Sequence, residues 1–425
     1  MFKRKPSGFT LVEILTVIVI IGILMGLAIP AITAALRTAN EAAIRNDINV
    51  LSQAVESYKL EHGEYPPDFT DWAAVESHFR RAFPNIDNNE LRILAQFTHY
   101  DASQARMDSS TPGPADPRAN PAFDHHPHAL DRAEALVFCL GGYSSEKNRP
   151  FTGQGGPLVL RSGVTLPALP APDDYLLFQY NNERDTGFFD FDITQMSVAL
   201  VTPSGAPPFA YSDDEGIDIG MTATNALGVT FHTDPFPVYR APKSELPLVY
   251  FHSRDYDLAW GAGIATSWNP SSSLPNSHHW QNVYLPAGAT PEATGVARPY
   301  AANVLDTTPP SVIEGNSVVG PVLEFAENDK FQIVSAGLDE HFGGILFDTW
   351  GASAAGIPVF PSGQYYNPFV AFTPPGPYGT VSEVNKYQDD LCLAQQYGLP
   401  AVYRVDNQLD NITNFSTRTL EGDLP

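Results

Sequence analysis

The sequence predicts an α+β protein in which one long amino-terminal helix packs, through its second half, on an antiparallel β-sheet that carries a large β-rich insertion. Three observations predict it. Residues 14–36 form an uncharged, mostly apolar run, residues 44–58 carry an apolar stripe at helical spacing, and short strand-like runs separated by turn residues fill much of the later chain. The 425 residues are enough for two or three ordinary domains, or for one small core with large insertions.

The apolar run contains 23 residues without a charge, which is long enough to cross the hydrocarbon core of a bilayer as a helix. Glu13 stands at its start, where a carboxylate facing lipid is costly and needs a partner. A cut between Gly8 and Phe9 would create an α-amine, and Glu13 would be the fifth residue of the cut chain. We therefore expect Glu13 to neutralise the Phe9 amine of a neighbouring subunit, which makes it an assembly contact.

The residues around the cut, Lys3-Arg4-Lys5 and Gly8-Phe9-Thr10-Leu11-Val12-Glu13, resemble the class III signal of type IV pilins and type II secretion pseudopilins. The resemblance implies that a prepilin peptidase removes residues 1–8 and methylates Phe9. Pro30 lies where helices of these families commonly carry a proline, and we expect it to kink the helix. A secretory signal peptide or a plain membrane anchor is the alternative, but both leave Glu13 unexplained.

The helix is expected to continue beyond the apolar run to residue 62, over about 80 Å. Ile44, Ile48, Leu51, Val55 and Tyr58 form its apolar stripe, and Gly63 with the following prolines ends it. The exit, Gly63-Glu64-Tyr65-Pro66, is similar to that of the major pseudopilin of type II secretion. The predicted organisation is a leader (1–8), a long helix (9–62, spanning the membrane over 14–36) and an exported head (63–425) with an insertion over 101–320.

Within the head, residues 70–100 and 130–140 have helical spacing, and the latter stretch carries Cys139. Five later runs read as strands: Tyr175–Tyr180, Phe188–Ile193, Met196–Val201, Leu246–His252 and Tyr256–Trp260. They predict an antiparallel, β-rich insertion between about 140 and 310.

A further strand, Phe331–Ser335, continues into Ala-Gly-Leu-Asp339 and resembles the carboxy-terminal strand and turn of the major pseudopilin. In that family the following loop holds calcium, so the resemblance implies Asp406 and Asp410 as ligands, with Asp339 as a third. About sixty residues intervene here and amides dilute the acids, so an acidic surface loop without metal is the alternative. Asn411 and Asn414 each begin a short glycosylation-type match.

Charge and motifs narrow the function. The chain has 24 basic and 48 acidic residues, a net charge of −24, which argues against nucleic acid as a partner. The sequence contains no phosphate-binding loop, nucleophile elbow or zinc-protease helix, so we expect no enzyme. The histidine run at 124–128 reads as a solvated loop, and the two cysteines, Cys139 and Cys392, either pair or are separate thiols.

The resemblance implies a pseudopilin: a single-pass protein of the bacterial inner membrane with its head in the periplasm, whose partners are prepilin peptidase and other pseudopilins or pilins. It would be a structural subunit of a filament that promotes protein export through an outer membrane. The alternatives are a type IV minor pilin with an adhesive head, and a carbohydrate-binding or hydrolytic domain held by a pilin-like anchor.

Overall fold

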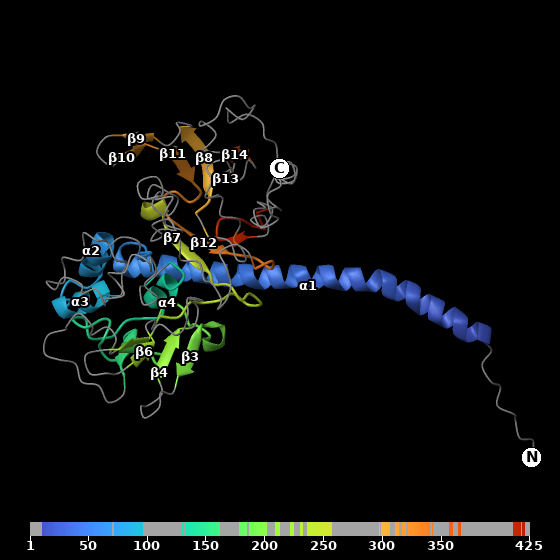
Figure 1. Ribbon diagram of the computed structural model, residues 1–425, viewed down its shortest axis with the longest axis horizontal. Coiled ribbons are helices and arrows are strands. Elements are labelled where there is room, and N and C mark those ends of the chain that lie inside the picture. The colour runs from blue at the N-terminus through green and yellow to red at the C-terminus, as the bar shows by residue number, and fades with distance from the viewer. Residues whose placement is uncertain are drawn as a thin grey trace, which may run out of the picture.

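The computed structural model has one long helix that projects from a head built around the helix's carboxy-terminal half (Figure 1). This arrangement confirms the predicted pilin-like α+β class. The structure describes residues 11–69, 72–96, 130, 132–161, 178–184, 187–201, 209–212, 222–224, 230–232, 236–256, 297, 299–306, 311–313, 317–319, 322–340, 342, 357–359, 364–366, 411–417 and 419–420.

Helix α1 (Leu11–His62) is continuous over 52 residues. The predicted stripe is confirmed, because Ile44, Ile48, Leu51, Val55 and Tyr58 are all fully buried. Gly63 ends the helix as expected: its N–H donates to the Lys59 carbonyl at 2.8 Å, and its φ of +87° is one that residues with a Cβ rarely adopt.

Three short helices follow α1. The predicted helical stretch at 70–100 forms two of them, α2 (Trp72–Ala82) and α3 (Asn88–Gln96), because Pro84 lies between them and cannot continue a helix. The stretch at 130–140 forms α4 (Ala135–Leu140), in which every residue is buried.

The sheet nearest α1 has three antiparallel strands in the order β15-β12-β7: β15 (Ile412–Thr413), β12 (Phe331–Ser335) and β7 (Val249–His252). Two of the predicted strands, Leu246–His252 and Phe331–Ser335, are thereby confirmed. Both edges are covered by the same chain, since Tyr250 N–H donates to the Arg132 carbonyl and Leu420 N–H donates to the Asn411 carbonyl. Another strand would have to displace these contacts in order to add to the sheet.

The remaining strands lie on both sides of α1 in Figure 1. They are, in order, β1 (Leu158–Leu160), β2 (Phe178–Tyr180), β3 (Val198–Val201), β4 (Phe209–Ser212), β5 (Thr222–Thr224), β6 (Thr230–His232), β8 (Ala301–Asp306), β9 (Ser311–Ile313), β10 (Ser317–Val319), β11 (Val322–Phe325), β13 (Ile357–Val359) and β14 (Gln364–Tyr366). Antiparallel pairing dominates, and among the described strands only β13 and β8 pair in parallel. The predicted β-rich character of the insertion is confirmed.

One predicted strand is wrong. Phe188–Ile193 is a loop, because Phe188 and Phe189 donate their N–H groups to the Leu140 carbonyl and Asp192 caps a short 3₁₀ turn. The alternating aromatic residues there reflect contacts of single rings and not strand pleating. The predicted strand Tyr256–Trp260 stays a prediction, because Tyr256 follows the 3₁₀ turn Ser253–Asp255 and residues 257–260 lie outside the described residues.

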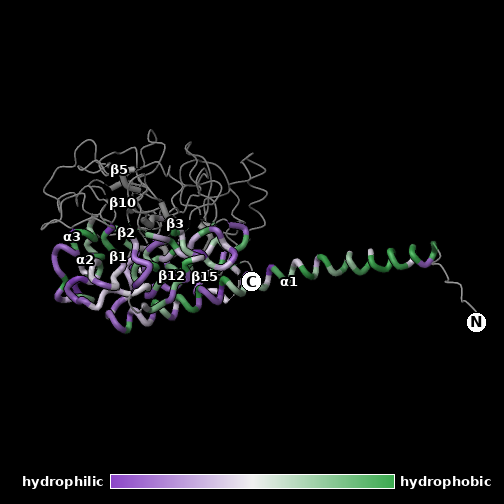
Figure 2. The backbone as a smooth tube through the Cα atoms, turned by 90° about the horizontal axis from the view of Figure 1, so that it is seen from below, coloured by the Kyte–Doolittle hydropathy of each residue, from purple (hydrophilic) through white to green (hydrophobic). Residues whose placement is uncertain are grey.

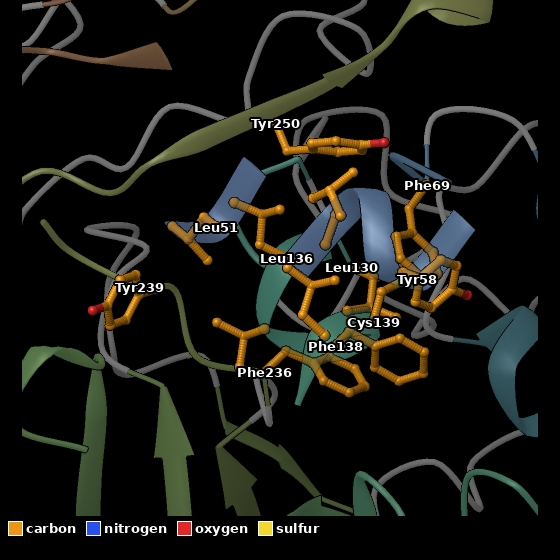
Figure 3. Packing of buried hydrophobic residues seen from close by; sticks show 14 of the residues in the cluster. Leu51, Tyr58, Phe69, Leu130, Leu136, Phe138, Cys139, Phe236, Tyr239 and Tyr250 are labelled. Carbon is orange, nitrogen blue, oxygen red and sulfur yellow. The ribbon is translucent and has the colours of Figure 1, made fainter. Parts of the chain in front are cut away.

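The core places α1 between two layers (Figure 3). Tyr250 of β7 lies on one side of the helix, and Leu136, Phe138 and Cys139 of α4 lie on the other. The apolar stripe of α1 thus becomes the centre of the head, whose main cluster also takes in α2 and α3.

Candidate functional site

The amino-terminal half of α1 is an apolar surface that the described part of the chain leaves uncovered. Every residue from 11 to 39 is exposed, and the large apolar side chains of this half are 44–79% exposed. Figure 2 shows this half as an almost uninterrupted hydrophobic tube leading away from the head. Among the described residues, α1 is the one helix long and apolar enough to cross a membrane.

Glu13 lies in the first turn of α1, where its negative charge is favoured by the helix dipole. It is the one acidic residue between Leu11 and Leu36, and no basic residue lies in that range. Gly8 and Phe9, the predicted processing site, lie outside the described residues, so the contact between Glu13 and a freed amine stays a prediction.

Pro30 does not end α1, which is continuous through it. Figure 1 shows the helix bent in its amino-terminal half, consistent with the expected kink. The hydroxyl of Thr33 donates to the Pro30 carbonyl at 2.9 Å, and that of Thr16 donates to the Val12 carbonyl at 2.9 Å. Both hydroxyls are therefore satisfied inside the helix, which suits a helix surrounded by lipid or by other helices.

The exit of α1 is fixed by polar contacts around the sequence Gly63-Glu64-Tyr65-Pro66. The Tyr65 hydroxyl donates to Glu56 at 3.1 Å, and the Lys59 ammonium lies 3.9 Å from the centre of the Tyr65 ring. The Tyr250 hydroxyl donates to the Pro66 carbonyl at 2.9 Å, so the exit is bonded to the central sheet.

A buried ion pair ties this exit to the insertion. Arg132 and Asp68 are each 1% exposed, and Arg132 Nε lies 3.4 Å from Asp68 Oδ2. The same carboxylate accepts a hydrogen bond from the His252 N–H at 3.3 Å. Asp68 thus joins three segments that are far apart in the sequence.

A turn follows β12, as the sequence Ala-Gly-Leu-Asp339 after this strand predicts. Gly337 has a φ of +75°, and its N–H donates to the Ser335 hydroxyl at 3.2 Å. Glu340 accepts hydrogen bonds from the Glu245 and Leu246 N–H groups at 3.1 and 3.0 Å, which fixes the turn to the segment before β7.

The structure describes only one of the three predicted calcium ligands. Asp339 lies exposed in this turn, whereas Asp406 and Asp410 lie outside the described residues. Within the described residues no group of three or more acidic, histidine or cysteine side chains is arranged to hold a metal ion. The histidine run at 124–128 also lies outside them.

Asn411 and Asn414, which begin the two glycosylation-type matches, both use their side chains for hydrogen bonds within the head. Asn411 is fully buried and donates to the Tyr300 hydroxyl at 2.6 Å and to the Phe342 carbonyl at 3.1 Å. Asn414 accepts from the Ile333 N–H at 2.8 Å and donates to the Phe331 carbonyl at 3.2 Å. Asn414 thus fastens the carboxy-terminal segment to β12, and Asn411 fastens it to Tyr300 and Phe342.

Several contacts were not anticipated from the sequence: the Arg132–Asp68 pair, these two asparagines, and a hydrogen bond between His78 and Tyr58. All join residues at least 20 positions apart, so local spacing carries no signal for them. Cys139 is a buried free thiol, and Cys392 lies outside the described residues.

Comparisons with known proteins identify the class of the amino-terminal region. Residues 3–29 match the family model of the prokaryotic N-terminal methylation motif. The region is thus type IV pilin-like, with the signal that precedes N-methylation, and the membrane-anchoring helix fits this class.

Three similar bacterial proteins narrow the class further, because each is a type II secretion system core protein G. The chain is 42% identical to the protein of Aeromonas hydrophila over 66 residues, which cover 16% of this chain and 46% of that protein. It is 39% identical to the Pseudomonas aeruginosa protein over 66 residues (16% and 46%) and 42% identical to the Escherichia coli protein over 62 residues (15% and 43%).

The chain thus spans less than half the length of the curated relatives it matches, and most of the head has no counterpart in the matched regions. No solved structure matches the chain.

Proposed function

We propose that this chain is a pseudopilin, a structural subunit of a type II secretion-type filament. A prepilin peptidase removes residues 1–8 and methylates Phe9, and the subunit is stored in the bacterial inner membrane with its head in the periplasm. It then assembles with other pseudopilins through the amino-terminal half of α1, and the filament promotes protein export.

The observation that carries this proposal is the bare half of α1. Residues 11–39 are exposed along their whole length, and the same helix continues without a break into the core of the head. Because the helix is continuous, a force applied to its apolar half is transmitted directly to the head. A filament subunit needs this connection, whereas a head tethered only for localisation does not.

The size of the head favours a minor or tip position over that of a repeating major subunit. The exported half of α1 is covered on one side by the central sheet and on the other by α4 (Figure 3), with further strands on both sides. A head this bulky would crowd a tightly wound shaft made of identical copies, whereas at the tip it has room.

The subunit contact is tested by Glu13→Ala in the full-length chain expressed with its neighbouring secretion proteins. We expect membrane insertion to persist, because the apolar run is intact, and incorporation to fall at least tenfold, measured by cross-linking to other pseudopilins. Glu61→Ala, which removes an exposed carboxylate from the exported half of the same helix, is the matched control. Normal incorporation of Glu13→Ala would remove the proposed contact.

Processing is tested by mass spectrometry of the protein purified from native membranes. We expect the mature chain to begin at Phe9 and to carry one added methyl group. A chain that still begins at Met1, or one trimmed beyond residue 36, would contradict the filament role.

We also propose, as a separate point, a calcium site formed by Asp339, Asp406 and Asp410. Oxygen donors suit calcium. Near the turn that carries Asp339 lies Asn411, whose buried Oδ1 has no hydrogen-bond partner among the described residues. The measurement is the melting temperature of the full-length protein in detergent. Calcium should raise it relative to a chelator by several degrees, Asp410→Asn should abolish the rise, and an unchanged melting temperature would remove the site.

A further inference from the structure

The carboxy-terminal end of α1 lies in a cage of aromatic rings that surrounds a histidine. The His62 ring is 4.4 Å from the Tyr58 ring, 5.5 Å from Phe83, 5.9 Å from Tyr143 and 5.7 Å from Phe188, measured between ring centres. Its Nε2 atom is buried and has no hydrogen-bond partner within the part of the chain that the structure describes. A proton on this ring would place a charge among apolar groups, where it is poorly solvated.

A second histidine, His78 of α2, connects α2 to this end of α1. Its Nδ1 lies 2.9 Å from Glu64 Oε1, and its Nε2 lies 2.7 Å from the Tyr58 hydroxyl. Because an ionised carboxylate only accepts, Nδ1 carries the proton in neutral His78, and Nε2 accepts from Tyr58. A second proton, on Nε2, would force the Tyr58 hydroxyl to turn towards Tyr143, 3.3 Å away.

Helix α3 is held differently. Glu90, which is buried, accepts hydrogen bonds from the Phe151 N–H at 2.8 Å and the Thr152 N–H at 3.0 Å, and the Thr152 hydroxyl also bonds to it. Burial raises the pKa of Glu90 above its ordinary value, so acid does not weaken this attachment relative to the detached state. The attachment of α3 through Glu90 therefore resists acid.

We propose that α2 is an acid-released cover: protonation of His62 and His78 loosens it from the end of α1 while Glu90 keeps α3 attached. Loosening exposes the rings of Tyr58 and Tyr143, at the end of α1 farthest from its amino terminus (Figure 1). This inference does not depend on the filament role.

The charged groups around His78 and His62 support release of α2 in acid. Glu64 of the α1 exit, Arg81 of α2 and Arg254 after β7 face His78, and His78 in turn faces His62. Glu64 favours the charged form of His78, but burial and the two arginines outweigh it and lower the pKa of His78. Glu64 is shared with Arg81, whose Nη1 lies 2.5 Å from Oε2, so it does not serve His78 alone.

The sign of the effect follows from linkage. Burial, helped by His78, lowers the pKa of His62 from 6.5 to about 4. When α2 is loosened, His62 therefore binds a proton below pH 6.5, whereas with α2 in place (the closed form) it does so only near pH 4. Loosening of α2 becomes more favourable as the pH falls between these values. For His62 alone the ideal change from pH 7.5 to 5 is about thirtyfold, and about tenfold once the partial exposure of the ring is allowed for.

Cys139 provides a reporter beneath the cover. Its side chain is fully buried and hydrogen-bonds with the hydroxyls of Tyr58 and Tyr143, and burial raises the pKa of the thiol to about 12. The closed form should therefore protect the thiol from reagents, and loosening of α2 should expose it.

The experiment uses the full-length protein in detergent with Cys392→Ser, so that Cys139 is the one remaining cysteine. Labelling with a pyridyl disulfide, which stays reactive in acid, is timed between pH 7.5 and 5. We expect the rate, corrected for the reagent's own pH dependence, to rise at least tenfold while the near-ultraviolet circular dichroism of the head persists. His62→Phe should remove most of the rise, and His78→Gln should reduce it.

Glu76→Gln is the matched control, because it removes a partly exposed titrating group from the same helix and should leave the rise unchanged. A rate that does not rise in acid would overturn the proposal. So would an equal rise in both histidine variants, or a rise that accompanies loss of the whole head signal. If one histidine variant fails to fold, the other decides the question, because each removes one of the two protonation sites.

Discussion

The two halves of α1 have the same backbone and opposite surroundings. Residues 11–39 are exposed without exception, whereas five apolar residues between Ile44 and Tyr58 are fully buried and Asp47 accepts a hydrogen bond from Tyr239 of the insertion. The first half has 23 consecutive uncharged residues, and the second alternates buried and exposed faces. One helix therefore meets two kinds of surroundings, divided near residue 40.

Helix continuity thus does not require a common source of stability. In the exported half, packing of a stripe against the sheet and α4 supplies the stabilisation. In the amino-terminal half no part of the described chain covers the apolar side chains, and this surface fits a membrane anchor. Changes in the two halves should consequently alter different properties of the protein.

The largest effect on the head is expected at the buried ion pair. Arg132→Met removes the guanidinium that pairs with the buried Asp68 carboxylate, which should lower the free energy of unfolding by about 3–5 kcal/mol. Chemical unfolding of the full-length protein in detergent measures it. The double variant with Asp68→Asn should recover part of the loss, and a single variant as stable as the parent would mean that the pair does not hold the α1 exit.

The next prediction compares the two halves of α1 by making the same isoleucine-to-alanine change in each. Ile48→Ala empties a fully buried site in the exported half and should destabilise the head by about 2–4 kcal/mol. Ile18→Ala makes the same change in the exposed half and should leave head unfolding unchanged, because the Ile18 side chain is exposed in the described structure. Equal losses in both variants would mean that the two halves are stabilised together.

A smaller, pH-dependent effect is expected at His252. Its Nδ1 accepts the Arg254 N–H at 3.0 Å, so the bonded ring is neutral, and burial lowers its pKa from 6.5 to about 4. The unfolded chain binds this proton first as the pH falls below 6.5, so stability should drop by about 1–2 kcal/mol between pH 7.5 and 5. His252→Gln should flatten that part of the pH profile in thermal melts. An unchanged profile would show that this histidine is not linked to unfolding.

Both halves of α1 could be predicted from the sequence because their signals are local. The uncharged run, the stripe from Ile44 to Tyr58 and the stop at Gly63 each depend on residues within a few turns of one another. The strand at Phe331–Ser335 was predictable for the same reason, since five consecutive residues have strand character and a glycine turn follows.

The contacts that pack the rest of the head on the exported half of α1 could not be predicted in the same way. Asp68 meets Arg132 across 64 positions and Tyr239 meets Asp47 across 192, and neither pairing is encoded in spacing. The loop at 188–193 was misassigned because apolar and acidic residues alternate from Phe189 to Ile193. In the structure the rings of Phe188, Phe189 and Phe191 instead contact Tyr58 and Tyr239. Tertiary contacts of single rings overrode the local pattern.

The smallest effect lies at Gly63, the residue that ends α1 and so fixes where the exported half stops. Among the described residues, nothing lies within 4 Å of a Cβ added there, so Gly63→Ala should act only through the φ of +87° that it strains. We expect a loss of about 1 kcal/mol in the unfolding of the head. Gly63→Asn, which tolerates this conformation better, should lose less. If alanine and asparagine were equally harmless, the helix would have to end by its contacts with Tyr65 and Pro66, and not by the backbone preference of one glycine.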